Sequence, residues 1–67
     1  MKYNLKFKEI DEVRESENEN IIIKDVLNEL GLSAQTIVTK QNGDLAIEES
    51  PINDGDEIHL VQIIYGG

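Results

Sequence analysis

A single short helical segment constrains this 67-residue chain more than any other feature. Asn20 is suited to cap its start, Gly31 supplies the left-handed residue that ends such a helix, and Leu32 can fold back on the last turn. A helix of about ten residues is unstable alone in water, so it needs a packing partner. The rest of the chain offers only strands. The face that would pack on them carries apolar side chains spaced three and four residues apart, at Ile23, Val26, Leu27 and Leu30.

The segment before this helix combines one clear strand with an acidic block. Residues 1–8 alternate between apolar and polar side chains, the pattern of a strand with one buried face. Residues 9–20 carry six acidic side chains against the single Arg14. We interpret this block as a solvated loop with a weak edge strand around Val13, where charge discourages pairing between sheet edges. The alternative interpretation is an acidic docking face for a basic partner.

The segment after the helix contains a hairpin and a final strand. Residues 35–48 include a β-branched run, the Asn42-Gly43 pair that favours a type I′ turn, and a resumed apolar pattern. A second turn is predicted at 53–56. The last strand is predicted from about Glu57 to Tyr65. The chain therefore reads as two strands, one helix and three strands, which indicates one helix packed on a mixed sheet.

The composition excludes several classes of function. Fourteen acidic and six basic residues give a net charge of −8, which opposes binding to nucleic acid or to anionic membranes. The absence of cysteine excludes disulfides and thiolate sites, and the single His59 cannot build a metal cluster. The turn at 54–57 lacks the ligand spacing of a calcium loop. A domain this small rarely encloses a substrate cleft, so we expect neither an enzyme nor a bound metal.

Two observations bear on the location of the protein. No apolar run exceeds three residues, as in Ile21–Ile23, which is far too short to cross a membrane. The alternating N-terminal residues 1–8 lack the apolar stretch of a secretory signal. We therefore expect a soluble cytoplasmic protein that binds neither membranes nor nucleic acid.

The last strand has two faces of different character. Alternation places Ile58, Leu60 and Ile64 toward the core, with Gln62 as a polar exception on the same face. An exposed apolar stripe is unusual for so small a protein, and we interpret it as a docking patch for a partner protein. The alternatives are that a loop covers the stripe or that the register differs by one residue. The outward residues predicted to bind the partner are His59, Val61, Ile63 and Tyr65.

Two stretches resemble a known family. The turn Asp54-Gly55-Asp56-Glu57-Ile58 is similar to the one that opens the final strand in the thiamine and molybdopterin sulfur-carrier proteins. The ending Val61-Gln62-Ile63-Ile64-Tyr65-Gly66-Gly67 resembles the tail of the thiamine carrier, and His59-Leu60-Val61 is similar to ubiquitin itself. The resemblance covers nearly the whole chain. It implies an α+β ubiquitin-like β-grasp fold, with a mixed four- to five-stranded sheet on one helix, as a single domain over residues 1–67.

The resemblance also implies a function for the diglycine tail. Side chains are absent from Gly66 and Gly67, so this end can enter a narrow channel. In the family an E1-like adenylating enzyme, using ATP that it binds itself, activates the terminal carboxylate, and a sulfur donor then converts it to a thiocarboxylate for a downstream acceptor. We expect a monomer without a permanently bound cofactor. One alternative is a ubiquitin-like modifier joined through Gly67 to lysines of target proteins. Another is an interaction domain whose diglycine is incidental.

Overall fold

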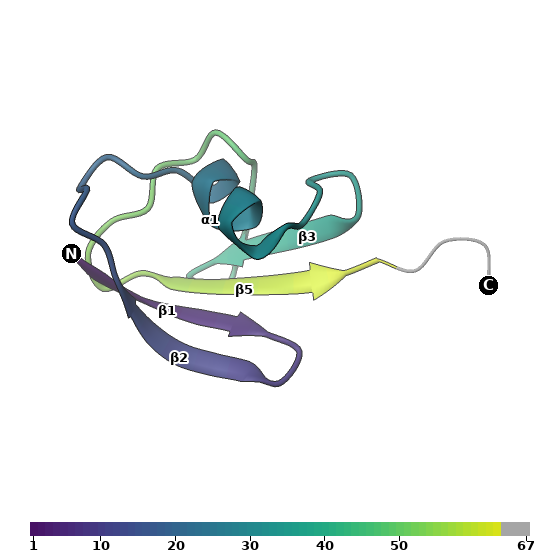
Figure 1. The fold of residues 1–67 in the computed structure, drawn as a ribbon. Coiled ribbons are helices and arrows are strands. Elements are labelled where there is room, and N and C mark those ends of the chain that lie inside the picture. Colours follow the sequence, from purple (N-terminus) through teal and green to yellow (C-terminus); the bar gives the residue numbers. More distant parts are fainter. Residues whose placement is uncertain (64–67) are drawn as a thin grey trace.

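The structure, a computed structural model, describes residues 1–63 and contains one helix packed on one face of a five-stranded sheet (Figure 1). The strand order is β2-β1-β5-β3-β4, with β1 and β5 parallel in the centre and the other pairs antiparallel. This arrangement is the ubiquitin-like β-grasp fold that the sequence predicted. The elements are β1 (Lys2–Phe7), β2 (Ile10–Glu15), α1 (Ile23–Leu30), β3 (Ile37–Gln41), β4 (Asp44–Ala46) and β5 (Glu57–Gln62).

The core lies between α1 and the middle of the sheet. Leu5, Ile58 and Leu60 of the two central strands are almost completely buried, as the alternating patterns predicted. The apolar helix face packs against them through Ile23, Val26 and Leu27. Ile52, in the irregular segment before β5, is also buried, although no periodic pattern marks it. The apolar faces predicted for the helix and for the first and last strands thus meet in one core.

The helix begins later than the sequence predicted. Its N-cap is Ile22, not Asn20, and it runs for eight residues instead of about ten. The preceding residues are held extended instead, because Ile22 forms a bridge with Pro51 and the Ile52 N–H donates to the Ile21 carbonyl at 2.9 Å. The Asp25 carboxylate accepts from the Ile22 N–H at 2.9 Å, which satisfies one free donor of the first turn.

The end of the helix is confirmed as predicted. Gly31 adopts a left-handed conformation with φ 71°. Its N–H donates to the Asn28 carbonyl, and the Leu32 N–H donates to the Leu27 carbonyl at 2.8 Å. These bonds satisfy carbonyls of the last turn in the manner of a Schellman motif.

The acidic block forms an edge strand and a loop. The predicted edge strand around Val13 is confirmed as β2, whose six residues pair with β1 along their full length, and residues 16–20 form the predicted loop. The register places Arg14 on the helix side, where its guanidinium contacts Glu29 of α1 at 2.8 Å and Glu12 at 2.9 Å. The one basic residue of the block therefore links the sheet edge to the helix, and acidic side chains remain along the outer edge.

The hairpin β3–β4 confirms the predicted turn and exposes the apolar residues that follow it. Asn42 and Gly43 both have positive φ, 54° and 89°, as a type I′ turn requires. The apolar residues Leu45 and Ile47 after the turn are 77% and 67% exposed. The register pairs Leu45 with Lys40 on the face of the sheet opposite α1.

A buried carboxylate joins this hairpin to the start of β5. Asp56 accepts hydrogen bonds from Gln41 Nε2 at 2.7 Å, Asn42 Nδ2 at 2.9 Å and the Asn53 N–H at 2.8 Å. Burial by itself would raise the pKa of Asp56, but the hydrogen bonds from Asn42, Asn53 and Gln41 outweigh it and hold the pKa below its usual value. The network thus favours the ionised carboxylate.

This network predicts an acid-sensitive contribution to stability. Asp56→Ala should lower the free energy of unfolding by about 2–3 kcal/mol at pH 7, because three donors lose a charged acceptor. A lowered folded pKa stabilises the fold above the unfolded pKa, and this contribution is lost as pH falls through the folded value. In urea titrations the deficit should therefore shrink as the pH falls below the ordinary carboxyl value of 3.8 and through the lowered pKa of the folded state. Glu49→Ala is the control, because the Glu49 carboxylate is exposed and forms no hydrogen bond or ion pair within residues 1–63. An equal, pH-independent deficit in both variants would contradict this role of Asp56.

Candidate functional site

The face of the sheet opposite α1, here called the open face, carries the outward residues of β5. His59 and Val61 are exposed on it, whereas their neighbours Ile58 and Leu60 are buried beneath α1. Cross-strand neighbours share a face, so the register adds residues from the adjacent strands. Val38 of β3 pairs directly with Val61, and Lys40 pairs with His59. On the other side of β5, Lys6 of β1 is level with His59.

The structure confirms the predicted direction of some site residues and leaves others outside the described chain. His59 and Val61 point outward as predicted, with Val61 41% exposed. Ile63 is also exposed, but it follows the strand, which ends at Gln62 and not at Tyr65. Its N–H donates to the Thr36 carbonyl at 2.8 Å. The predicted residues outside residues 1–63 are Ile64, Tyr65, Gly66 and Gly67.

Gln62 differs from the prediction in its burial. It was expected to be an inward polar exception, and it does share the face of its partner Ile37. Ile37 is buried, but Gln62 is exposed. A polar side chain at this end of β5 therefore leaves no unsatisfied group in the core.

Two apolar residues of the open face were missed by sequence reasoning. Val38 is half-buried beside Val61, and Leu45 lies beyond Lys40 on β4. The type I′ turn at 42–43 was the signal that could have located Leu45, because a two-residue turn fixes the register of its hairpin. Val38 could not be placed that way, because its pairing with β5 joins segments far apart in the sequence. The apolar residues of the open face, Val38, Leu45 and Val61, thus extend over three strands and are called the apolar centre below.

A shallow hollow lies beside the second half of β5, next to Lys8 in the turn that follows β1. It has a volume of about 380 Å³ and is lined by Lys8, His59, Leu60, Val61 and Gln62. Within the described part of the chain, no group of three or more His, Cys, Asp and Glu side chains could hold a metal ion. The hollow therefore offers apolar contact and the ammonium of Lys8, which suits binding to a protein surface.

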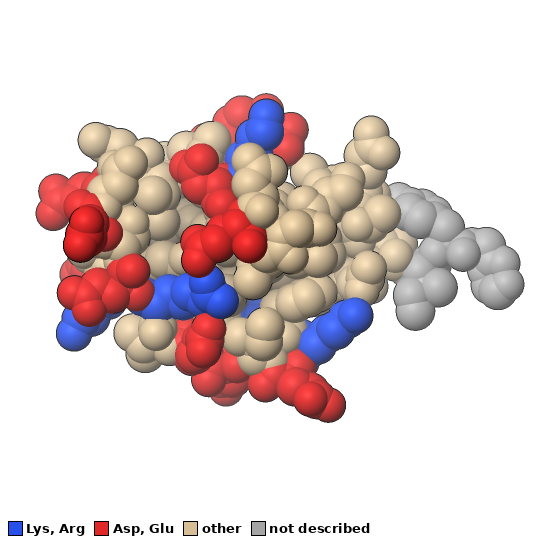
Figure 2. Space-filling model, viewed as in Figure 1, with Lys and Arg blue, Asp and Glu red and all other residues tan. Residues whose placement is uncertain are grey.

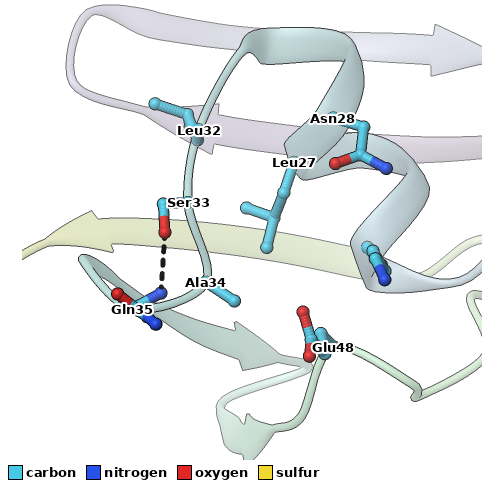
Figure 3. Close-up of a pocket in the computed structure, with 8 residues that line it drawn as sticks. Leu27, Asn28, Leu32, Ser33, Ala34, Gln35 and Glu48 are labelled. Atoms are coloured by element: carbon cyan, nitrogen blue, oxygen red, sulfur yellow. Dashed lines mark hydrogen bonds between the residues drawn. The ribbon is translucent and has the colours of Figure 1, made fainter.

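A second hollow lies on the helix side of the molecule (Figure 3). Leu27 and Asn28 of α1 form one wall, and the segment from Leu32 to Gln35 forms another, with Glu48 facing them from across the opening. The Gln35 N–H donates to Ser33 Oγ at 3.2 Å, which shapes this segment as a turn. Lys24 and Glu48 are its only ionisable lining residues among those described, too few for a metal or acid–base site.

The charges of the molecule are unevenly distributed. Acidic side chains cover much of the β2 edge and the helix side, whereas the end of the molecule near the C-terminus of β5 is mainly uncharged in this view (Figure 2). The sequence explains this separation, since residues 30–43 and 58–67 contain no Asp or Glu. The position of the acidic residues in the sequence therefore keeps their charges away from the end of β5. A negatively charged ligand approaching the end of β5 would meet little repulsion there.

Comparisons with known proteins agree with this geometry. A model of the ThiS family matches residues 1–67, so the chain belongs to the ThiS family. The crystal structure of the thiamine biosynthesis protein ThiS from Geobacter metallireducens is similar over 100% of both chains, with a TM-score of 0.73 and 18% identity. SAMP1 from Haloferax volcanii is similar over 98% of this chain and 97% of its own, with a TM-score of 0.68 and 18% identity. These likenesses to solved structures show the fold.

No helix among the described residues is long and apolar enough to cross a membrane. The helix α1 has eight residues, and one of its faces is polar and exposed. A span of the hydrocarbon core needs about twenty apolar residues in a helix.

The exposure of Val61 makes the docking prediction testable. Val61→Asp should leave the fold intact, at a cost of about 1 kcal/mol, because the side chain lies on the open face. It should strongly weaken binding to a partner that covers the apolar centre, measured by titration calorimetry with the adenylating enzyme that the family resemblance implies, in purified form. Ile63→Asp should behave in the same way.

Val13→Asp is the matched control for this substitution. Val13 is 64% exposed on the edge strand β2, away from the apolar centre of the open face. Its variant should bind the enzyme as the wild type does. Unfolding of Val61→Asp, seen by circular dichroism, would refute the assigned facing of β5, and equal binding by both variants would refute the docking role.

Proposed function

We propose that this protein is a sulfur carrier whose Gly67 carboxylate is activated by an E1-like adenylating enzyme. The carboxylate attacks the α-phosphate of ATP, which gives an acyl-adenylate and releases pyrophosphate. A sulfide then displaces AMP and leaves a thiocarboxylate. Where the sulfur arrives as a persulfide, an acyl disulfide forms first and a thiol releases the thiocarboxylate from it. The observation that carries this proposal is the match of the whole chain, diglycine included, to the ThiS family.

The proposal assigns the carrier two tasks. It supplies the reacting carboxylate at Gly67, and it supplies a docking surface on the open face around Val61. The chain is proposed not to be an enzyme and to bind no cofactor permanently; ATP is bound by the partner. The apolar pair Val38 and Val61 supports this division, because apolar side chains at the centre of a patch are typical of protein interfaces.

The charge distribution also supports the proposal. An activated tail must approach the triphosphate of ATP, and acidic residues close to it would oppose that approach by Coulomb repulsion. In this chain, with a net charge of −8, the ten residues from Ile58 to Gly67 contain no acidic side chain. ATP-dependent activation further suggests a cytoplasmic location. The sulfur donor and the downstream acceptor are additional partners in this scheme.

A ubiquitin-like modifier is the alternative, because it would use the same acyl-adenylate. Only the final nucleophile differs: a lysine amine of a target protein attacks in place of sulfur. The fold likeness to SAMP1 fits either function. An interaction domain with an incidental diglycine is the second alternative, and it predicts no activation of Gly67.

The first step can be tested by reconstitution with the E1-like enzyme from the same genome. With ATP, the wild-type chain should support exchange of labelled pyrophosphate into ATP and gain the mass of AMP. A variant lacking Gly66 and Gly67 should lose both signals while its circular dichroism spectrum stays unchanged, since the deleted residues follow the folded strands. Full activity of the deletion variant would disprove the proposed role of the tail. Activity of neither chain would favour the interaction-domain alternative.

A further inference from the structure

Lys8 occupies a backbone conformation that lysine rarely adopts. The pair Phe7 and Ile10 closes the hairpin between β1 and β2, so the turn contains only Lys8 and Glu9. Lys8 has φ 54°, in the left-handed region where glycine and asparagine are favoured. Of the described non-glycine residues, only Asn42 shares a positive φ. A lysine at this position costs stability that a glycine would not, so a role for its side chain is the natural explanation.

The turn places Lys8 beside the exposed strand segment of the candidate site. Phe7 is level with Leu60 in the parallel β1–β5 pair, so the next residue, Lys8, reaches the level of Val61. Lys8 accordingly lines the shallow hollow together with His59 and Val61. Its ammonium stands 5.4 Å from the centre of the Phe7 ring, a contact that steadies the side chain.

The ammonium of Lys8 has no anionic partner within residues 1–63. Its neighbour Lys6 differs, because it lies 3.3 Å from Glu57. No acidic residue follows Glu57 in the chain, so the part of β5 that is level with Lys8 supplies no carboxylate. Lys40 lies on the other side of β5, opposite His59. In a protein with a net charge of −8, the segment His59–Val61 is thus flanked by cations.

We infer that Lys8 is a specificity-determining contact that pairs with a carboxylate of the adenylating enzyme at the edge of its apolar docking surface. The inference rests on the proposed function and deepens it. A carboxylate is favoured over the phosphates of ATP for a geometric reason. Gly67 is the sixth residue after Val61, so a tail that enters a nucleotide site in extended form spans about 20 Å. A nucleotide at its end then lies beyond the reach of a lysine side chain level with Val61.

Lys8→Gly separates this role from a structural one. The substitution removes the charge and relieves the left-handed backbone, so Tm should rise while kcat/KM for adenylation falls about tenfold at low salt. The difference in kcat/KM between this variant and the wild type should become smaller as the salt concentration is raised, because salt screens the ion pair. Lys8→Arg should retain most of the activity. Lys24→Gln, which removes an exposed cation on the helix side, is the matched control and should behave as the wild type.

The outcomes separate the two proposals. Wild-type adenylation with an unaffected Lys8→Gly variant overturns this inference and leaves the proposed function standing. A loss of activity equal in Lys8→Gly and Lys24→Gln also overturns it, since net charge alone would then be responsible. Absence of wild-type adenylation overturns the proposed function and this inference together. A higher Tm with a salt-dependent loss of activity confined to Lys8→Gly supports it.

Discussion

The parallel pairing of β1 and β5 is the contact on which the rest of the structure depends. It brings the first and last strands together at the centre of the sheet and buries Leu5, Ile58 and Leu60 beneath α1. Parallel strands need a long connection, and here residues 8–56 supply β2, the helix and the hairpin that complete the core. Because β5 is central, its outward residues are flanked on both sides by other strands. The open face around Val61 follows directly from this position.

The same architecture explains how the charges are arranged. Lys6 of β1 and Lys40 of β3 flank His59 on the two sides of β5, while most acidic residues lie on the edge strand β2, on α1 and in the loops. Charge at an edge discourages pairing with other sheets, and its absence around the end of β5 leaves an apolar surface that a partner can cover. This distribution of charged side chains favours solubility of the whole molecule and leaves one face of the sheet accessible to a partner.

Local patterns predicted the elements well because short-range physics determines them. The apolar stripe of α1, the cap at Gly31 and the turn at 42–43 depend on neighbouring residues, and all three are confirmed. The features that the sequence did not predict are determined by tertiary contacts. Asn20 does not cap the helix because residues 21 and 22 are held extended by bonds to residues 50–52. The exposure of Leu45, the place of Val38 and the strained turn at Lys8 depend on strand register or on backbone geometry that composition does not reveal.

The central claim is that the Gly67 carboxylate is chemically activated in the cell, and mass spectrometry of the native C-terminus tests it most directly. Protein recovered from its own cells and cleaved after Glu57 releases a peptide from Ile58 to Gly67. The account predicts a fraction of this peptide in which sulfur replaces one terminal oxygen. The same peptide joined to lysines of other proteins would instead establish the modifier function. A free carboxylate throughout, in cells supplied with sulfur and energy, would contradict the account.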